Sequence, residues 1–235
     1  KQGWDGVLAE SWESRENRWV FKLKKGIKFH NGATLTSKDV VFSIEKMRDE
    51  KGGSLQAPNF RDVTEILTPD DQTVIFVTKQ PLAVFLDRLR NRFIVSKVAG
   101  DKYGDQLYQN LVGTGPYKFV SFQRGGNLGF TRNDDYWGDK PFFQQIQISV
   151  VPDISQQILQ LQAGTIDAVP IDYPFAQLTS LPAGLEITDV PSMIPYDLFV
   201  KPNSPLDDAE VRKAVLTAIN PALWVKDAFG EFASL

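Results

Sequence analysis

Residues 19–32 read WVFKLKKGIKFHNG and decide how the first part of the chain folds. Apolar side chains stand at alternate positions of its first half: Trp19, Phe21 and Leu23. Arg18, Lys22 and Lys24 stand on the other face, where only Val20 breaks the alternation. This is the pattern of a strand with one face buried and one face in water. Lys25-Gly26 and Asn31-Gly32 are turn signals, because glycine and asparagine tolerate a positive φ. The stretch therefore predicts strands joined by tight turns.

The neighbouring sequence extends this region to about residue 135. Thr36 with Asp39 three residues later has the spacing of a capping box, with Asp in place of the usual Glu. The helix that it opens carries one apolar stripe, formed by Val40, Val41, Ile44 and Met47. Further strands are expected at 63–67, 73–78, 117–122 and 128–131, each pair joined by a turn. These features predict an α+β region with many strands.

After residue 136 the pattern favours a βαβ unit. A strand at 146–151 is followed by a helix with apolar residues at positions 154, 158 and 161, and Gly164 suits a left-handed helix end. A strand at 166–169 would complete the unit, and the two strands are then expected to be parallel. Asp208 is expected to cap a helix over 211–219. The whole chain is therefore predicted to be an α/β, or mixed α+β, protein.

Composition excludes several classes of function. The chain has 235 residues and 42% hydrophobic residues, which is enough for a buried core. Its 26 Lys and Arg against 29 Asp and Glu give a net charge of −3, which argues against a nucleic-acid partner. It has no cysteine and one histidine, which excludes thiolate metal sites, disulfides and two-histidine zinc motifs. No apolar run approaches the roughly 18 residues of a membrane-spanning helix.

Two short motifs and one histidine each have two interpretations, as a functional site or as a simple turn. Gly113-Thr114-Gly115-Pro116 resembles a phosphate-binding loop, but Lys118 replaces a required glycine and Pro116 lacks an amide donor, so a turn is favoured. Asn133-Asp134-Asp135 lacks the ligand spacing of an EF-hand, so a solvated turn is favoured. His30 is expected to be a partly exposed turn residue. The residues alone therefore indicate no catalytic set.

Two further hypotheses stay open. Arg88, Arg90 and Arg92 alternate, so in an extended chain all three would share one face and present a guanidinium to a carboxylate ligand. A solvated edge is the simpler interpretation. The Asp134-Asp135 pair beside two aromatic residues, in a chain with five tryptophans, leaves a carbohydrate-active hydrolase open. That chemistry needs two carboxyl groups about 5 to 9.5 Å apart.

As a pattern, the sequence resembles the extracellular solute-binding proteins of family 5, which are the peptide, nickel and opine receptors of bacterial ABC importers. The resemblance keeps order and spacing through these segments: 8–13 (LAESWE), 19–32, 35–43 (LTSKDVVFS), 113–117 (GTGPY), 133 with 136–138 (YWG), 152–153 (PD), 161–167 (LQAGTID), 205–208 (PLDD), 211–214 (VRKA) and 218–220 (AIN). It is specific for the family and much less so for the ligand.

The resemblance implies a two-lobed clamp that closes on solute, as in a type II periplasmic binding protein. Residues 1–135 then correspond to an extra α+β subdomain of the first lobe, 136–204 to its βαβ core, and 205–235 to the start of the second lobe. Most of the second lobe is expected to lie outside this sequence, so the chain is expected to be a fragment. Family members are roughly twice as long.

The resemblance also implies candidate ligand contacts, although the groups that hold peptide termini in relatives lie in the second lobe. Arg92 resembles a position where nickel-type members carry a cleft arginine that meets the carboxylates of a metal chelator. The other candidates are Ile171, Asp172 and Tyr173, which follow a core strand where α/β sheets place ligands, and Met193 and Tyr196, which lead to the hinge. Val200 after Phe199 departs from the usual Phe-Asn and leaves the hinge hydrogen bonding open.

The resemblance thus implies a receptor without enzymatic activity, cofactor or metal site. Its expected partners are a small solute, with an oligopeptide favoured, and the ABC permease subunits. It is expected to be periplasmic or an extracytoplasmic lipoprotein, which meets the membrane only through the permease or an upstream lipid anchor. A chelated-nickel, opine or sugar-type solute is the alternative within the family. A hydrolase, or a peptide-holding chaperone without transport, is the alternative outside it.

Overall fold

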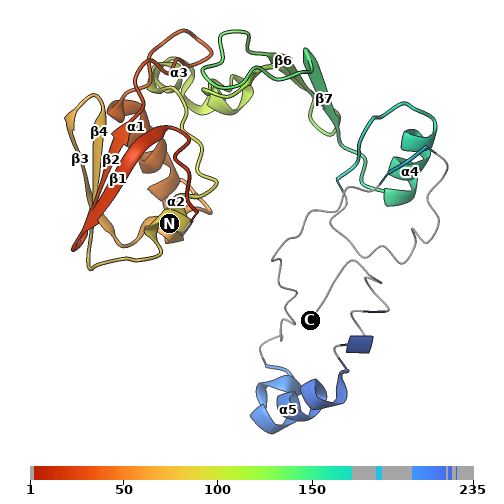
Figure 1. Cartoon of the computed structure of the whole chain (residues 1–235). Coiled ribbons are helices and arrows are strands. Elements are labelled where there is room, and N and C mark those ends of the chain that lie inside the picture. The colour runs from red at the N-terminus through yellow and green to blue at the C-terminus, as the bar shows by residue number, and fades with distance from the viewer. Residues whose placement is uncertain (1–2, 171–183, 187–202, 221, 224–225, 227–235) are drawn as a thin grey trace. The chain divides into compact units, whose positions relative to one another are not determined.

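The computed structural model describes residues 3–170, 184–186, 203–220, 222–223 and 226. The chain forms two compact units, Lys1–Val150 and Val151–Leu235. Both strands and helices are described in the first unit, and helices are described in the second (Figure 1). The finer boundaries expected at residues 135 and 204 follow from the family plan and stay predictions.

A four-stranded antiparallel sheet opens the first unit, in the order β1-β2-β4-β3. Its strands are β1 (Ala9–Arg15), β2 (Arg18–Leu23), β3 (Val63–Asp70) and β4 (Thr73–Thr78). On β2, Trp19, Phe21 and Leu23 are buried and the residues between them are more exposed. The alternation predicted for this stretch is therefore confirmed.

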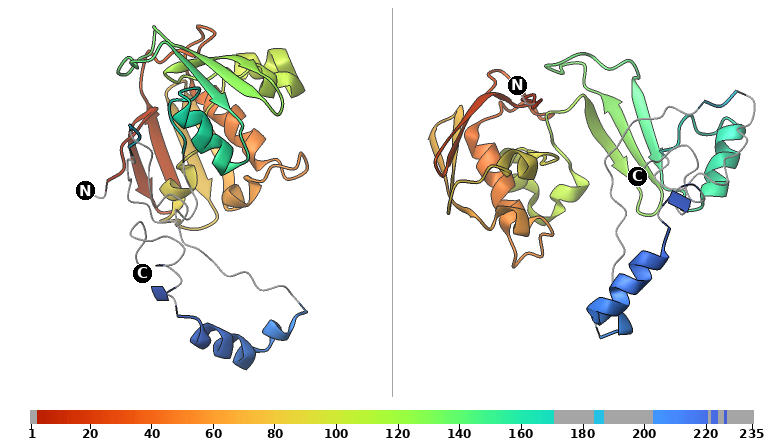
Figure 2. Two further views of the ribbon diagram at one scale, coloured as in Figure 1. Left: turned by 90° about the vertical axis from the view of Figure 1, so that its right-hand side faces the viewer. Right: turned by 60° about the horizontal axis from the view of Figure 1, so that its bottom comes forward.

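Helices cover the buried face of this sheet (Figure 1 and Figure 2). They are α1 (Ser37–Arg48), the 3₁₀ helix η1 (Ala57–Phe60) and α2 (Phe85–Leu89). Phe85 has no exposed surface, and its ring centroid lies 5.2 Å from that of Phe76 and 5.7 Å from that of Trp19. Val40 and Ile44 of α1 join the same core, as the predicted apolar stripe requires. Aromatic burial thus holds β2, β4 and α2 together.

One buried carboxylate connects the starts of two helices. Asp39 Oδ2 accepts hydrogen bonds from the Thr36 backbone N–H and hydroxyl, both at 2.9 Å, so the predicted capping box is confirmed. Asp39 Oδ1 accepts the Lys97 backbone N–H at 2.8 Å. Lys97 is the first residue of α3 (Lys97–Tyr103), which continues into the 3₁₀ helix η2 (Gly104–Gln109). Asp39 therefore satisfies otherwise unpaired donors of both helices.

A second, three-stranded sheet follows in the same unit, in the order β5-β6-β7. Its strands are β5 (Tyr117–Phe122), β6 (Asn127–Arg132) and β7 (Gln145–Ser149). The predicted hairpin of β5 and β6 is confirmed. β7 pairs antiparallel with β6, and residues 166–169, where a strand was expected, form none. A strand requires a neighbouring backbone, and none pairs with 166–169 among the described residues. The βαβ core expected over 136–204 stays a prediction.

The second unit contains α4 (Ile154–Gln162), the short η4 (Pro205–Asp207) and α5 (Ala209–Ala218). The expected cap at Asp208 is confirmed, since Asp208 accepts the Glu210 N–H at 2.8 Å. Asp153 caps α4 in the same way and accepts the Gln156 N–H at 2.9 Å. Gly164 has a φ of 68°, as a left-handed helix end requires. Across the described ranges, no helix is both long and apolar enough to cross a bilayer. The sequence pattern also predicts a helix at 175–181 and strands at 185–190 and 196–200, and of these only residues 185 and 186 lie within those ranges.

Candidate functional site

Arg92 is the predicted ligand contact that falls within the described residues. It follows α2 directly, after Asn91 turns the chain with a φ of 58°. The next residues run beside α1, where the Val95 N–H donates to Ser43 Oγ at 3.0 Å and the Lys97 N–H donates to Asp39. Arg92 therefore begins a segment that α1 holds in place.

The Arg92 guanidinium has donors that the described part of the chain does not use. The side chain is half-buried, and its Nε atom is buried without a hydrogen-bond partner. Nη1 makes a long 3.5 Å contact with the Asn91 carbonyl, and no described carboxylate lies within 4.0 Å of the group. A guanidinium presents five N–H donors in a planar fork that matches a carboxylate. Because Nε is buried, a ligand carboxylate would meet this group at its two Nη atoms.

The expectation that three arginines share one face is wrong, because the chain is helical where extension was assumed. Arg88 lies within α2 and forms an ion pair with Asp62, with 2.7 Å between Nη1 and Oδ2. Arg90 ends the same helix and is exposed. A helical turn rotates successive side chains by about 100°, so the two-residue spacing does not align them. Arg92 therefore does not form one cationic face with Arg88 and Arg90.

The Gly113-Pro116 motif forms a turn whose carbonyl groups are all bonded within the protein. The carbonyl oxygens of Val112, Gly113 and Thr114 accept hydrogen bonds from the Ser96 N–H (3.1 Å), the His30 N–H (2.9 Å) and Trp137 Nε1 (3.0 Å), respectively. Those of Gly115 and Pro116 accept from His30 Nε2 (2.9 Å) and the Asn133 N–H (2.8 Å). A phosphate-binding loop instead points backbone N–H groups at its ligand. The simpler interpretation, a turn before a strand, is confirmed.

His30 is half-buried, and its ring bonds to a carbonyl 85 residues away in sequence. Burial of the ring lowers its pKa below the ordinary value, and the nearby Lys118 ammonium lowers it further. The hydrogen bond with Gly115 opposes this shift. Sequence reasoning predicted a turn residue and missed this contact. The available signal was that His30, the 113–117 motif, Asn133 and Trp137 all belong to the segments that carry the family resemblance.

Asp134 is held by two cations, with Oδ1 at 2.7 Å from Lys140 Nζ and 3.0 Å from Arg132 Nε. Hydrogen bonds from Lys140, which has the larger effect, and from Arg132 lower the pKa of this carboxyl. Its charged form is therefore favoured, which is unfavourable for the proton donor of a glycosidase. Where the structure describes the chain, no three His, Asp or Glu side chains gather in a way that could hold a metal ion.

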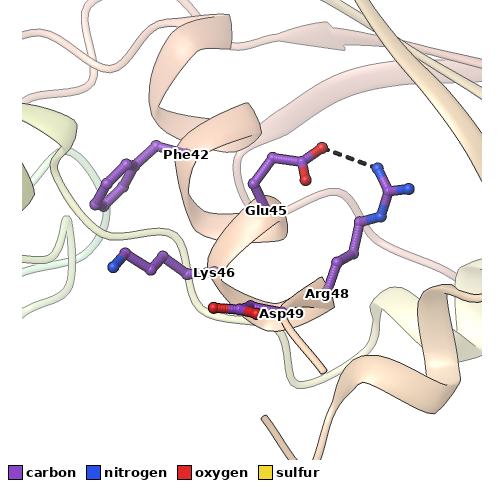
Figure 3. Close-up of a pocket in the computed structure, with 5 residues that line it drawn as sticks. All are labelled: Phe42, Glu45, Lys46, Arg48 and Asp49. Carbon is purple, nitrogen blue, oxygen red and sulfur yellow. Dashed lines mark hydrogen bonds and ion pairs between the residues drawn. The ribbon is translucent and has the colours of Figure 1, made fainter. Parts of the chain in front are cut away.

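A surface hollow of about 480 Å³ lies on α1 and is lined by Phe42, Glu45, Lys46, Arg48 and Asp49 (Figure 3). Arg48 forms an ion pair with Glu45 at 2.8 Å and also donates to the Val63 carbonyl at 2.9 Å. Asp49 accepts the Gly52 N–H at 2.8 Å. Three of the four charged groups of the hollow are therefore already engaged by the protein itself, which makes it a poor candidate for a solute site.

The remaining candidate contacts lie outside the described residues. They are Ile171, Asp172, Tyr173, Met193 and Tyr196. Their roles stay predictions that rest on the family resemblance.

Comparison with known proteins gives the family. The model described as Bacterial extracellular solute-binding proteins, family 5 Middle, matches residues 4–235. The probable D,D-dipeptide-binding periplasmic protein DdpA of Escherichia coli K12 is 31% identical over 226 residues, covering 90% of this chain and 43% of that protein. The chain therefore spans less than half the length of this curated relative.

Solved structures agree with this comparison. MoaA from A. tumefaciens R10, in complex with mannopinic acid, matches with a TM-score of 0.66 and 31% identity, over 69% of this chain and 34% of that one. NikZ from Campylobacter jejuni, in complex with Ni(L-His), matches with a TM-score of 0.64 and 28% identity, over 68% of this chain and 33% of that one. Because the family model covers nearly every residue and these folds agree, the resemblance and the mixed α/β fold predicted from the sequence are confirmed. The chain belongs to the bacterial extracellular solute-binding proteins of family 5.

Proposed function

We propose that this chain is part of a receptor that captures a small solute outside the cytoplasmic membrane for an ABC importer, with an oligopeptide-like solute favoured. The observation that carries the proposal is the family match over residues 4–235. DdpA supports the preference for a peptide, since its name describes a dipeptide-binding protein. The receptor works without enzymatic turnover and is periplasmic or held at the membrane by a lipid anchor.

The proposed mechanism is closure of two lobes around the solute. Burial from both sides removes water from the solute and adds contacts that one lobe alone lacks. Solute then favours the closed state because it binds that state more tightly than the open one. The closed receptor delivers its solute to the permease subunits. In this scheme the proposed solute contacts are Arg92 and, from the family resemblance, Ile171, Asp172, Tyr173, Met193 and Tyr196.

Arg92 is proposed to bind a carboxylate of the solute. A dipeptide, mannopinic acid and L-histidine, the ligands named for DdpA, MoaA and NikZ, are chemically different but each carries a carboxylate. The unused donors of Arg92 suit that shared group. A chelated metal or an opine is the second candidate solute, supported by the likeness to NikZ and MoaA. Native mass spectrometry of the complete receptor, with any co-purified solute identified, distinguishes these classes.

Arg92→Ala is expected to weaken the binding of a carboxylate-bearing solute by about 10- to 100-fold, since a hydrogen bond to a charged group contributes about 1.5–3 kcal/mol. Calorimetric titration of the complete receptor with a carboxylate-bearing solute, and with the amide of the same solute, measures the effect. The variant should lose the preference for the free carboxylate.

Arg90→Ala is the matched control, because Arg90 is an exposed arginine two residues away at the end of α2. It should leave affinity within about twofold of the parent protein. Equal losses in the two variants, or an unchanged preference for the free carboxylate in Arg92→Ala, would rule out the proposed role of Arg92.

A further inference from the structure

His30 occupies a position in which a second proton has no acceptor. Its Nε2 lies 2.9 Å from the Gly115 carbonyl oxygen, which can only accept, so the neutral ring carries its proton on Nε2. The other ring nitrogen, Nδ1, is buried and has no hydrogen-bond partner. Protonation of Nδ1 would place a charged N–H in a buried position without a partner, which is unfavourable.

The charged groups around this ring do not compensate for a second positive charge. Lys118, at the start of β5, acts on the ring with a charge of the same sign. Lys24 lies over the Trp137 ring, with Nζ 5.2 Å from the ring centroid, and adds another cation to this region. Asp134, in the segment after β6, is already paired with Lys140 and Arg132, while Asp135 is exposed. The surroundings therefore favour the neutral ring.

The His30 ring also belongs to a connected set of hydrogen bonds. The residue holds the 112–116 turn twice, through its backbone N–H to Gly113 and its ring to Gly115. Asn133 shares the Gly115 carbonyl through Nδ2 at 3.2 Å, and Trp137 bonds to the Thr114 carbonyl. Around them, Ile27, Phe29 and Leu35 form a small core against which Trp137 and Val112 pack. A change at the ring therefore acts on a turn that several segments share.

We propose that His30 acts as a pH-sensitive contact. The neutral ring holds the 112–116 turn closed through its hydrogen bond, and uptake of a second proton by the ring releases that turn. The closed turn favours the neutral ring, whereas an opened turn exposes the ring to water and allows protonation. Acid then shifts the equilibrium toward the open turn. The inference does not depend on which solute the receptor binds.

The direction of the pH dependence follows from linkage. Since the pKa of His30 is lower in the folded protein than the ordinary value of about 6.5, the closed turn has its full stability above that value. The stability falls as the pH drops from about 6.5 through the folded-state pKa. The ratio of closed to open turn falls by up to about tenfold for each pH unit between the ordinary pKa of histidine and the pKa of His30 in the folded protein.

The single histidine of the chain permits a direct test. In protein labelled with ¹⁵N-histidine, every imidazole nitrogen signal belongs to His30. The expected result is the Nε2–H tautomer at neutral pH and a titration midpoint below about 6.5. Hydrogen-exchange protection factors of the Asn133 amide and the Trp137 indole N–H should fall between about pH 6.5 and that midpoint and then level off. The Thr78 amide, bonded to the Asn17 carbonyl at 2.8 Å, should stay protected.

His30→Gln is the matched variant, because a glutamine amide can donate to the Gly115 carbonyl but does not titrate. Its protection factors at Asn133 and Trp137 should not change between about pH 5 and 7.5. The inference is overturned by the Nδ1–H tautomer, by a midpoint at or above about 6.5, or by the same loss of protection in the glutamine variant. Equal loss at Thr78 would show unfolding of the whole unit and would overturn it as well.

Discussion

Replacing Phe85 by alanine should destabilise the first unit by about 4 kcal/mol, which is typical for truncation of a buried phenylalanine. Phe85 has no exposed surface and lies at the centre of an aromatic cluster, with Trp19, Phe21 and Phe76 around it. The substitution removes those contacts and leaves a cavity that β2 and β4 cannot fill without distortion. Urea unfolding of the chain, followed by circular dichroism and tryptophan fluorescence, measures the change.

Val84→Ala is the matched control, since Val84 precedes Phe85 and is 49% exposed. It should change stability by less than about 1 kcal/mol. If Phe85→Ala were as mild as this control, Phe85 could not be the centre of the core described here. Phe85 is buried and is not proposed to contact the solute. Phe85→Ala should therefore lower the apparent solute affinity only by reducing the fraction of receptor that is folded.

Asp39→Ala should lower the free energy of unfolding by about 3 kcal/mol, because it leaves three buried hydrogen-bond donors without an acceptor. Two belong to Thr36 at the start of α1 and one is the Lys97 backbone N–H at the start of α3. The loss of a cap alone costs about 1 kcal/mol, so the larger figure tests whether the link between the two helices matters. Urea unfolding measures the stability, and amide exchange at Lys97 reports α3 separately.

Asp101→Ala is the control, because Asp101 also contacts Lys97 but does so at the surface. Its carboxylate lies 2.6 Å from Lys97 Nζ, and both side chains are largely exposed. Such pairs contribute about 0.3–0.5 kcal/mol, so this variant should be nearly neutral. A comparable loss in both variants would show that the buried position of Asp39 has no special importance.

The local structure was predicted well where neighbouring residues decide it. The alternation of Trp19, Phe21 and Leu23 requires a strand with one buried face whatever surrounds it. The caps at Asp39 and Asp208 were predicted for the same reason, since a side chain three residues or fewer from an unpaired N–H can bond it in any context. The strand expected at 166–169 is not formed, because a short apolar run becomes a strand only where another backbone pairs with it, and the sequence pattern does not show that partner.

The candidate site was less predictable than the fold. Arg92 was selected from a family resemblance, and its unused donors became visible only in three dimensions. The alternation of Arg88, Arg90 and Arg92 suggested one cationic face, but α2 turns Arg88 toward Asp62. The same limit applies to Ile171, Asp172, Tyr173, Met193 and Tyr196, whose roles stay predictions. Ligand contacts come from segments far apart in the chain, and spacing within one segment does not determine where they meet.

The sequence by itself determined the family, most strands of the first unit, and the helix caps at Asp39 and Asp208, because these depend on residues close together in the chain. Only the tertiary structure decided that the β7 edge pairs antiparallel and that Asp39 reaches Lys97. It alone brought His30 to a carbonyl 85 residues away. The physical reason is that hydrogen bonds and ring contacts depend on distance in space, and many sequence separations are compatible with the same local pattern.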